Sequence, residues 1–430
     1  MSPAPAIAFV TLGCPKNEVD SDRMAALVAS SAYRLVDEPD DADVVVLNTC
    51  AFIQPATEES IAEALTLAGE WRPARAGRAL VVAGCMVSRY GPELADAMPE
   101  VDAFLPVADE HSVLRVLESL LGTAAEATPG PSRTAGSATA YLKVSEGCDR
   151  RCAYCTIPAI RGAFVSDPVE RVLEEASLLI AGGARELVLV GQDIASYGTD
   201  LASGEDLPAL VKRIDALEGD FRIRLMYLQP DGVTDRLLSV IAESRRVCRY
   251  LDIPLQHASA TVLEAMGRTG SPERHLALLE RIRAVMPDVV LRTTVMAGFP
   301  GETDADAAEL ERFIAEAAFD FVGVFGFSAE EGTPAASLAG EVPEQVRLER
   351  AQRLRDVADE TGFERAAALV GSVQRVLVES VEEGELVGRT CGQAPDVDGI
   401  TVLEAELPVG EFADVRIIDA AGYDLIGGPL

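Results

Sequence analysis

The chain of 430 residues is long enough for two or three domains, and its apolar content of 48% can supply each of them with a buried core. Its 70 acidic and 37 basic residues leave a net charge of −33, which disfavours nucleic acid and favours a basic protein as partner. No apolar run has the length of a membrane span and the first residues form no charged leader, so we predict a cytoplasmic protein without a membrane partner.

The first part of the chain has the alternating pattern of a parallel α/β domain. Three short apolar runs are predicted to be strands buried on both faces, and amphipathic stretches between them are predicted to be helices. This pattern predicts a Rossmann-like domain over residues 1–122. The predicted strands are 6–12, 43–49 and 79–84, and the predicted helices are 20–32 and 57–70.

One cysteine follows each of these strands, and we call Cys14, Cys50 and Cys85 the dispersed triplet. The carboxyl ends of parallel strands lie along one edge of a sheet, where ligands bind, so we expect the three side chains to converge there. Thiols stay reduced in the cytoplasm, which favours a metal site over disulfides. Three unrelated buried cysteines are the alternative, but they would not account for one cysteine at every strand end.

A linker rich in Pro, Gly, Ser and Ala is predicted at 123–139. Residues 140–368 alternate strand and helix six times, which predicts a partial barrel of the TIM type with its chemistry at the carboxyl ends of the strands. A long charged helix is predicted at 344–369, and residues 369–430 have the short Val-rich strands of a small β-barrel. The other predicted strands are 140–145, 186–190, 222–227, 250–253, 289–295 and 321–325, and the helices are 168–181, 206–217, 234–244, 272–285 and 303–318.

A second set of cysteines, the loop triplet, follows the first strand of the central region. Cys148, Cys152 and Cys155 have the spacing Cys-x3-Cys-x2-Cys, with Tyr154 before the last one. Structural zinc sites are closed by four ligands, whereas three thiolates suit an iron–sulfur cluster that keeps one iron open for chemistry. A zinc loop with a remote fourth ligand is the alternative, but the three histidines form no paired motif. Two triplets therefore predict two clusters in one enzyme.

The loop triplet, with an aromatic residue before its last cysteine, resembles the radical S-adenosylmethionine superfamily. The resemblance narrows to the methylthiotransferases and covers essentially the whole chain, with a terminal β segment that resembles the family's TRAM domain. The segments that carry it are GCPKN at 13–17, NTCAFI at 48–53, GC at 84–85, GQD at 191–193, GFPGET at 298–303 and EEGT at 330–333.

The resemblance implies a transferase that replaces a C–H bond of its substrate by C–SCH3. It implies a [4Fe–4S] cluster on the loop triplet, which binds S-adenosylmethionine and generates a radical, and a second [4Fe–4S] cluster on the dispersed triplet, which carries the sulfur. S-adenosylmethionine is implied as both methyl donor and radical source. The residues implied to bind this cofactor are Tyr154, Gly191, Gln192, Gly298 and Gly301.

The family divides into tRNA adenosine modifiers and a branch that modifies an aspartate of ribosomal protein uS12. The sequence DIPLQHAS at 252–259 resembles the second branch. The segment 369–430 has three arginines and twelve carboxylates, a net charge of −9, which suits a basic ribosomal protein better than phosphate. We therefore predict methylthiolation of the β-carbon of an aspartate in uS12, free or in the small ribosomal subunit, without direct tRNA binding. A reducing partner such as a flavodoxin or ferredoxin, and a sulfur donor, are implied as well.

Two other functions are weighed against this one. A tRNA adenosine methylthiotransferase would need salt-sensitive tRNA binding, which an acidic C-terminal segment should prevent. A non-catalytic iron–sulfur sensor or scaffold would leave the barrel and its Gly-rich turns without a purpose. An acidic proteome would also account for the charge, because the chain has three lysines against 34 arginines.

Five further residues need separate comment. Gln229 and Phe327 stand where the family often has tyrosine, so both positions lack a hydroxyl group. His257 is a lone histidine, and such residues more often have a structural place than a place in a substrate cavity. Cys248 and Cys391 lie outside both triplets and are predicted to be small buried apolar side chains.

Overall fold

The structure is a computed structural model that describes residues 4–123 and 137–430. Most of the predicted linker, 123–139, lies outside the described residues. No helix in the described part of the chain is long and apolar enough to cross a membrane. The chain forms two compact units: the first contains residues 1–135, 146–150 and 155–165, and the second contains residues 136–145, 151–154 and 166–430.

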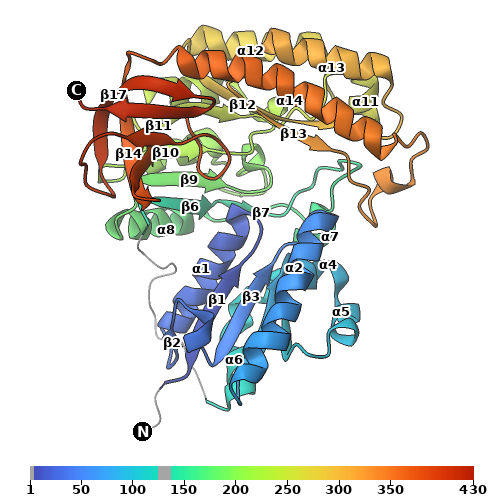
Figure 1. Cartoon of the computed structure of the whole chain (residues 1–430), viewed down its shortest axis with the longest axis vertical. Coiled ribbons are helices and arrows are strands. Elements are labelled where there is room, and N and C mark those ends of the chain that lie inside the picture. The colour runs from blue at the N-terminus through green and yellow to red at the C-terminus, as the bar shows by residue number, and fades with distance from the viewer. Residues whose placement is uncertain (1–3, 124–136) are drawn as a thin grey trace. The chain divides into compact units, whose positions relative to one another are not determined.

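A five-stranded parallel sheet forms the centre of the first unit (Figure 1). Its order, β2-β1-β3-β4-β5, is that of a doubly wound fold, whose ligands bind at the carboxyl ends of the strands beside the point where the order reverses. Here the order reverses between β1 and β3. The strands are β1 (Ala6–Thr11), β2 (Arg34–Leu35), β3 (Val44–Thr49), β4 (Ala79–Gly84) and β5 (Ala103–Pro106).

Helices connect these strands, and their starts follow from the sequence. The first helix begins at Pro15, five residues before the predicted start, because the fixed φ of proline suits the first turn of a helix. Strand β3 is buried at every position, as its continuous apolar run predicted. The helices of the first unit are α1 (Pro15–Ala29), α2 (Gln54–Thr66), α3 (Arg72–Ala74), α4 (Cys85–Tyr90), α5 (Pro92–Ala97), α6 (Val113–Leu121) and α7 (Ile157–Arg161).

The second unit contains a six-stranded parallel sheet of order β13-β12-β11-β10-β9-β6, in which successive strands of the chain are neighbours. This order is that of a partial β/α barrel and confirms the prediction. The strands are β6 (Thr139–Lys143), β9 (Glu186–Val190), β10 (Arg222–Leu225), β11 (Val247–Asp252), β12 (Val290–Ala297) and β13 (Phe321–Gly326). The short strands β7 (Ser145–Glu146) and β8 (Val165–Ser166) flank the loop triplet.

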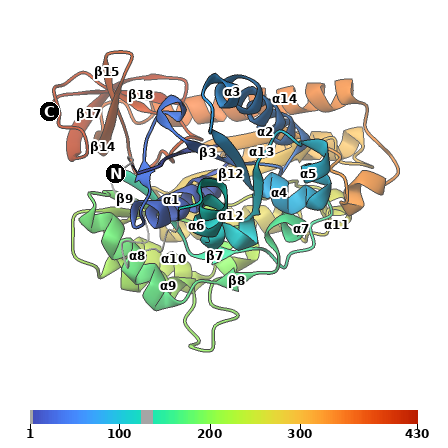
Figure 2. The same cartoon turned by 90° about the horizontal axis from the view of Figure 1, so that it is seen from below.

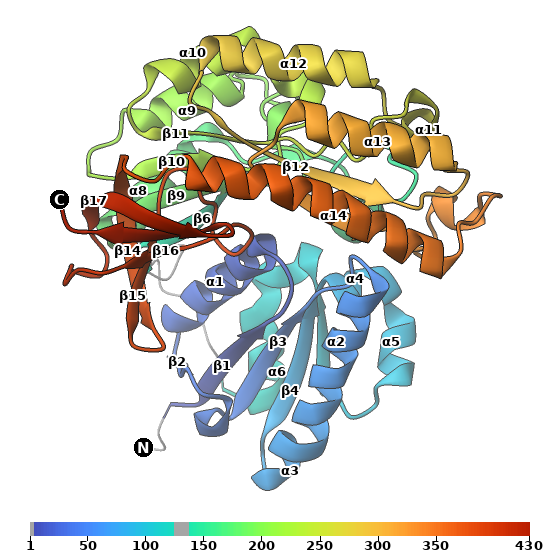
Figure 3. The same ribbon diagram turned by 45° about the horizontal axis from the view of Figure 1, so that its top comes forward.

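A row of helices covers the outer face of this sheet. Figure 2 shows α8, α9 and α10 next to one another, and Figure 3 shows α12, α13 and α14 continuing the row. Apolar side chains from the helices and strands form one continuous core. The helices are α8 (Val169–Ala181), α9 (Leu207–Asp215), α10 (Asp235–Glu243), α11 (Ala260–Ala265), α12 (Pro272–Val285), α13 (Asp304–Ala317) and α14 (Glu344–Ala367).

The end of the chain forms a closed barrel of order β14-β15-β16-β18-β17, as predicted. Because the barrel is closed, each of its strands is paired on both sides, and no unpaired edge is left that could promote aggregation. We call it the C-terminal barrel. Its strands are β14 (Val373–Glu382), β15 (Glu385–Arg389), β16 (Thr401–Leu403), β17 (Phe412–Ala421) and β18 (Asp424–Gly428).

A buried charge network joins the C-terminal barrel to the parallel sheet within the second unit. The carboxylate of Glu186, which is fully buried, accepts hydrogen bonds from Arg222 and Arg389 at 2.7 Å and from Arg224 at 2.6 Å. Burial alone would raise the pKa of Glu186, but the three guanidinium groups lower it well below its usual range. Glu186 and Arg222 are the first residues of β9 and β10, so the barrel is held at the amino ends of the sheet.

Replacing Glu186 by glutamine should destabilise the second unit by about 3–5 kcal/mol, because three buried guanidinium groups would lose their counter-charge. Circular dichroism should record this change as a lower urea concentration at the midpoint of unfolding. Trp71, the single tryptophan and a buried residue of the first unit, serves as the internal control, since its fluorescence transition should not move. Glu170→Gln is the matched variant, because the Glu170 side chain is 79% exposed beside Arg213, and it should behave like the unmodified protein.

Candidate functional site

The dispersed triplet lies at the carboxyl ends of three neighbouring strands. Cys14, Cys50 and Cys85 follow β1, β3 and β4, which are adjacent in the sheet and include the point where its order reverses. The Oδ1 atom of Asn17 is 4.0 Å from Cys14 Sγ and 3.6 Å from Cys85 Sγ. A Cβ atom on Gly13, whose φ is +100°, would lie 2.6 Å from Cys50 Cβ, so only glycine fits beside this cysteine. The three thiols therefore share one edge of the sheet.

Asn17 holds this arrangement in place from the first turn of α1. Its Nδ2 donates to the carbonyl oxygens of Leu12 at 2.8 Å and Thr49 at 3.1 Å, which are at the ends of the two strands that carry Cys14 and Cys50. The side chain is fully buried, so these hydrogen bonds also meet the requirement that buried polar groups be paired. Its amide oxygen is thereby directed at the thiols.

A buried arginine completes the site. Arg161 donates to Asn17 Oδ1 at 2.7 Å, to Asp20 Oδ2 at 2.9 Å and to Cys85 Sγ at 3.4 Å. The side chains of Arg161 and Asp20 are each only 1% exposed. Arg161 comes six residues after Cys155, so a segment that continues from the loop triplet supplies a cation to the dispersed triplet. A guanidinium at this place favours sulfur ligands in their anionic form.

Burial changes the titration of two thiols of this site. Burial raises the pKa of Cys50, and it raises the pKa of Cys85 to about 12 although Arg161 acts in the opposite direction. Such thiols keep their protons until a metal replaces them. No three His, Cys, Asp or Glu side chains among the described residues could hold a single metal ion. In an iron–sulfur cluster, each thiolate binds its own iron, so the ligands need not meet at one ion.

The loop triplet belongs to a segment without regular structure between β7 and α7. The amide of Cys148 donates to the carbonyl oxygen of Gly162 at 3.2 Å, which folds the loop back on itself. Gly147 has a φ of +73°, and a Cβ atom there would lie 2.1 Å from the carbonyl oxygen of Ala163. A glycine before the first cysteine is thus required by the close approach of two chain segments.

A second arginine lies beside the loop triplet, in the second unit. Arg268 Nη1 is 3.8 Å from Cys152 Sγ and 3.4 Å from the hydroxyl of Tyr154. Its Nη2 donates to Gln229 Oε1 and to the carbonyl oxygen of Pro254, both at 2.8 Å. Gln229, which stands where the family often has tyrosine, therefore positions the guanidinium that faces the cysteine.

The other residues predicted to bind S-adenosylmethionine lie after strands of the second sheet. Gly191 and Gln192 follow β9, while Gly298 and Gly301 lie in the turn after β12. Glu302 shapes that turn, because its Oε2 accepts the amide of Gly298 at 2.6 Å. These positions are at the carboxyl ends of the strands, which is where β/α barrels bind their ligands.

Two strained residues mark the same strand ends. Tyr227 and Gln256 have φ angles of +62° and +73°, and they follow β10 and β11. A non-glycine residue in this conformation costs about 1–3 kcal/mol and is concentrated at functional sites. Asp252 supports the first of them, because its Oδ2 accepts the amide of Tyr227 at 3.0 Å.

His257 and Phe327 have structural positions. His257 is fully buried, its Nδ1 accepts the amide of Ser259 at 2.9 Å, and its Nε2 lies 3.6 Å from Glu302 Oε2. These contacts favour a structural position for this histidine over a position in a substrate cavity. Phe327 packs edge-on against Phe299, with ring centroids 5.3 Å apart. This aromatic contact stabilises the position without the hydroxyl group that a tyrosine would have.

Two residues of the site belong to no predicted motif or site: Arg161 and Arg268. Nothing in their local sequence distinguishes a buried arginine from an exposed one, since arginine is mostly a surface residue. The only available signal was proximity in sequence, because Arg161 lies within the helix that follows the loop triplet.

Comparisons with known proteins agree with this architecture. Residues 142–314 match the Radical SAM superfamily, residues 6–106 match the uncharacterized protein family UPF0004, and residues 370–429 match the TRAM domain. Two proteins named ribosomal protein uS12 methylthiotransferase RimO are similar over most of the chain. The one from Geobacter sulfurreducens is 40% identical and covers 98% of both chains, and the one from Syntrophus aciditrophicus is 42% identical and covers 97% of both.

Solved structures share the fold. The radical S-adenosylmethionine methyltransferase TsrM from Kitasatospora setae has a TM-score of 0.54 and 13% identity, covering 86% of this chain and 80% of that chain. The cobalamin-dependent radical enzyme OxsB has a TM-score of 0.54 and 11% identity, covering 83% of this chain and 56% of that chain.

The superfamily match and the relatives named methylthiotransferases define a radical S-adenosylmethionine transferase, a class that implies an iron–sulfur cluster and S-adenosylmethionine as cofactors. The chain adds two parts to the partial barrel: the parallel N-terminal sheet, which matches UPF0004, and the closed C-terminal barrel, which matches the TRAM domain. By its identity to relatives over nearly its whole length, the chain belongs to the RimO family of methylthiotransferases.

Proposed function

We propose that the chain methylthiolates the β-carbon of an aspartate in ribosomal protein uS12, in the cytoplasm, with two [4Fe–4S] clusters. The observation that carries the proposal is the meeting of Cys14, Cys50 and Cys85 at one sheet edge, in a chain whose relatives are named uS12 methylthiotransferases. The dispersed triplet holds one cluster and the loop triplet holds the other. When bound, the clusters and S-adenosylmethionine supply the radical, the sulfur and the methyl group.

The chain's own residues bind and orient these groups. Asn17 fixes the ends of β1 and β3, and Arg161 offsets the negative charge of the sulfur ligands on the dispersed triplet. Arg268 has the corresponding place beside Cys152. We assign Tyr154 and Gln192 to the binding of S-adenosylmethionine, with Gly191, Gly298 and Gly301 letting the backbone approach it. Under this proposal residues 1–122, 140–368 and 369–430 are three functional domains, with a linker at 123–139 between the first and the second.

An acidic groove on the C-terminal barrel supports a basic protein substrate. The groove extends over β15, β16 and β18 and combines apolar side chains with carboxylates. Ribosomal proteins are basic, so opposite charges would speed and orient the encounter. The same charges would repel tRNA. The carboxylates that line the groove are Glu385, Glu404, Glu406 and Asp424.

The test is anaerobic reconstitution with iron, sulfide, S-adenosylmethionine and a low-potential reductant such as reduced flavodoxin. A synthetic peptide from the uS12 loop, intact uS12 and small ribosomal subunits are supplied separately, and mass spectrometry follows the products. We expect one methylthio group on an aspartate of uS12. A methylthio group on tRNA adenosine instead would show that the proposed substrate is wrong and that the proposed chemistry is right. Failure to cleave S-adenosylmethionine at all would favour a non-catalytic iron–sulfur protein.

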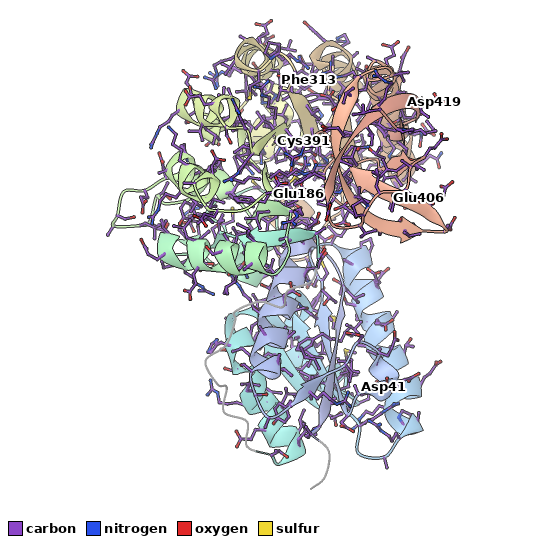
Figure 4. The ribbon with its side chains drawn as sticks, turned by 90° about the vertical axis from the view of Figure 1, so that its left-hand side faces the viewer. Asp41, Glu186, Phe313, Cys391, Glu406 and Asp419 are labelled. Atoms are coloured by element: carbon purple, nitrogen blue, oxygen red, sulfur yellow. The ribbon has the colours of Figure 1, made fainter. Side chains whose placement is uncertain are left out.

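Reversing one charge in the groove should weaken uS12 recognition. For Glu406→Lys we expect KM for uS12 to rise about fivefold at low salt, with kcat little changed, because one favourable charge becomes repulsive. Asp419→Lys changes the same charge at an exposed site on β17 outside the groove and is the matched control (Figure 4). Equal effects of the two variants, or no effect of either, would show that the groove does not receive the substrate.

A further inference from the structure

Two cysteines outside both triplets face each other in the second unit. Cys248 is the second residue of β11 and is buried, whereas Cys391 lies just after β15 in an exposed position. Their Sγ atoms are 3.2 Å apart. The prediction of two small buried apolar side chains is therefore right for Cys248 and wrong for Cys391, which has a thiol as its neighbour and a surface position.

The charge network of Glu186 fixes the chain around this pair. Arg224 donates to the carbonyl oxygen of Cys391 at 2.9 Å, and Arg222 donates to that of Arg389 at 3.0 Å. Figure 4 shows Cys391 and Glu186 close together where the parallel sheet meets the C-terminal barrel. The two sulfur atoms are thus held together by contacts that do not involve sulfur.

The same surroundings make the two thiols unequal. The hydrogen bond from the Cys248 thiol, with help from Arg222 and Arg224, lowers the pKa of Cys391 to about 6. Burial raises the pKa of Cys248 well above its usual range. The two shifts favour the thiolate at Cys391 and the thiol at Cys248, which is the combination that thiol–disulfide exchange requires.

We propose that Cys248 and Cys391 are a redox-active dithiol that forms a disulfide across the junction of the sheet and the C-terminal barrel. The oxidant is a low-molecular-weight disulfide. The Cys391 thiolate attacks one of its sulfur atoms and expels the first small thiolate. Cys248 then loses its proton to solvent, attacks Cys391 Sγ and expels the second. Two electrons pass to the oxidant, and one protein S–S bond replaces the S–S bond of the small molecule.

The bond would change how firmly the C-terminal barrel is attached. It closes a loop from residue 248 to residue 391, and long loops are those for which a cross-link restricts the unfolded chain most. Oxidation should therefore raise the urea midpoint of the second unit. The proposal does not depend on the substrate or on the number of clusters, because neither cysteine belongs to a triplet.

The test uses the full chain with its clusters reconstituted, equilibrated without oxygen in buffers of glutathione and oxidised glutathione. After acid quenching and alkylation, trypsin should release residues 247–249 and 390–416 as two peptides. In oxidising buffers we expect a cross-linked pair of these peptides, two hydrogen masses below their sum, and its loss after reduction. Cys391→Ser and Cys248→Ser should each abolish the pair and the rise in the urea midpoint.

Three results would overturn the proposal. Both thiols of the native chain could remain alkylated at the most oxidising ratio. Cys391 could stop at a lasting mixed disulfide with glutathione. The cross-linked peptides could also form only after the chain has been unfolded in urea. Each of these results comes from the unsubstituted protein, so none depends on whether a variant folds.

Discussion

A Cys50→Ala variant is expected to cleave S-adenosylmethionine but to leave uS12 unmodified. Cys50 lies at the end of β3 within the dispersed triplet, away in sequence from the loop triplet that we assign to radical generation. Removing one of three sulfur ligands should empty one cluster site and lower the iron content to about half. Iron and sulfide analysis, 5′-deoxyadenosine formation and mass spectrometry of uS12 measure the three quantities separately.

The matched control is Cys248→Ala, which removes a thiol of similar burial outside both triplets. It should retain the iron content and both activities. The proposed roles of the two triplets would be contradicted if the Cys50→Ala variant still methylthiolated uS12. They would also be contradicted if it lost both S-adenosylmethionine cleavage and methylthiolation.

Replacing Arg161 by methionine is expected to destabilise the first unit by about 3–5 kcal/mol and to lower its iron content. The side chain keeps its volume, but the buried carboxylate of Asp20 loses its cation and Cys85 loses its donor. Trp71 fluorescence in urea follows the stability of this unit. Electron paramagnetic resonance of reduced samples follows the cluster on the dispersed triplet, in a Cys152→Ala background that leaves only this site.

Three comparisons separate charge from geometry at Arg161. Arg161→Lys should recover most of the stability and only part of the cluster signal, since lysine cannot bond Asn17, Asp20 and Cys85 together. Asp20→Asn combined with Arg161→Met should cost less than the two single changes added. Arg75→Met, at a half-exposed pair with Asp43, should cost less than about 1 kcal/mol. Full cluster loading in Arg161→Met would show that the arginine is only structural.

The sequence was a good guide to the sheets. Continuous apolar runs such as 43–49 can only be buried on both faces, and they became central strands. Strands β2 and β5 were missed because they lie at the edges, where two or four residues suffice for pairing and leave no pattern. Helix α11 was missed because six residues are too few to display a helical period.

The candidate site was predictable in its sulfur atoms but not in its charges. A cysteine at the end of each strand has one expected place, since parallel strands end along one edge. Arg161 instead reaches Asp20 across 141 positions of sequence, and the pairing of Cys248 with Cys391 spans 143. Such contacts arise from tertiary packing, which no local window of residues contains.

The attachment of the C-terminal barrel has a consequence for biosynthesis. Arg389 and the carbonyl oxygens of Arg389 and Cys391, which satisfy Glu186, Arg222 and Arg224, are made about 200 residues after Glu186. A nascent chain therefore carries an incompletely paired charge cluster at the amino ends of its parallel sheet until residues 389–391 have been made. Chains that terminate before residue 389 should remain open to proteolysis at this place, because they lack Arg389 and the two carbonyl groups.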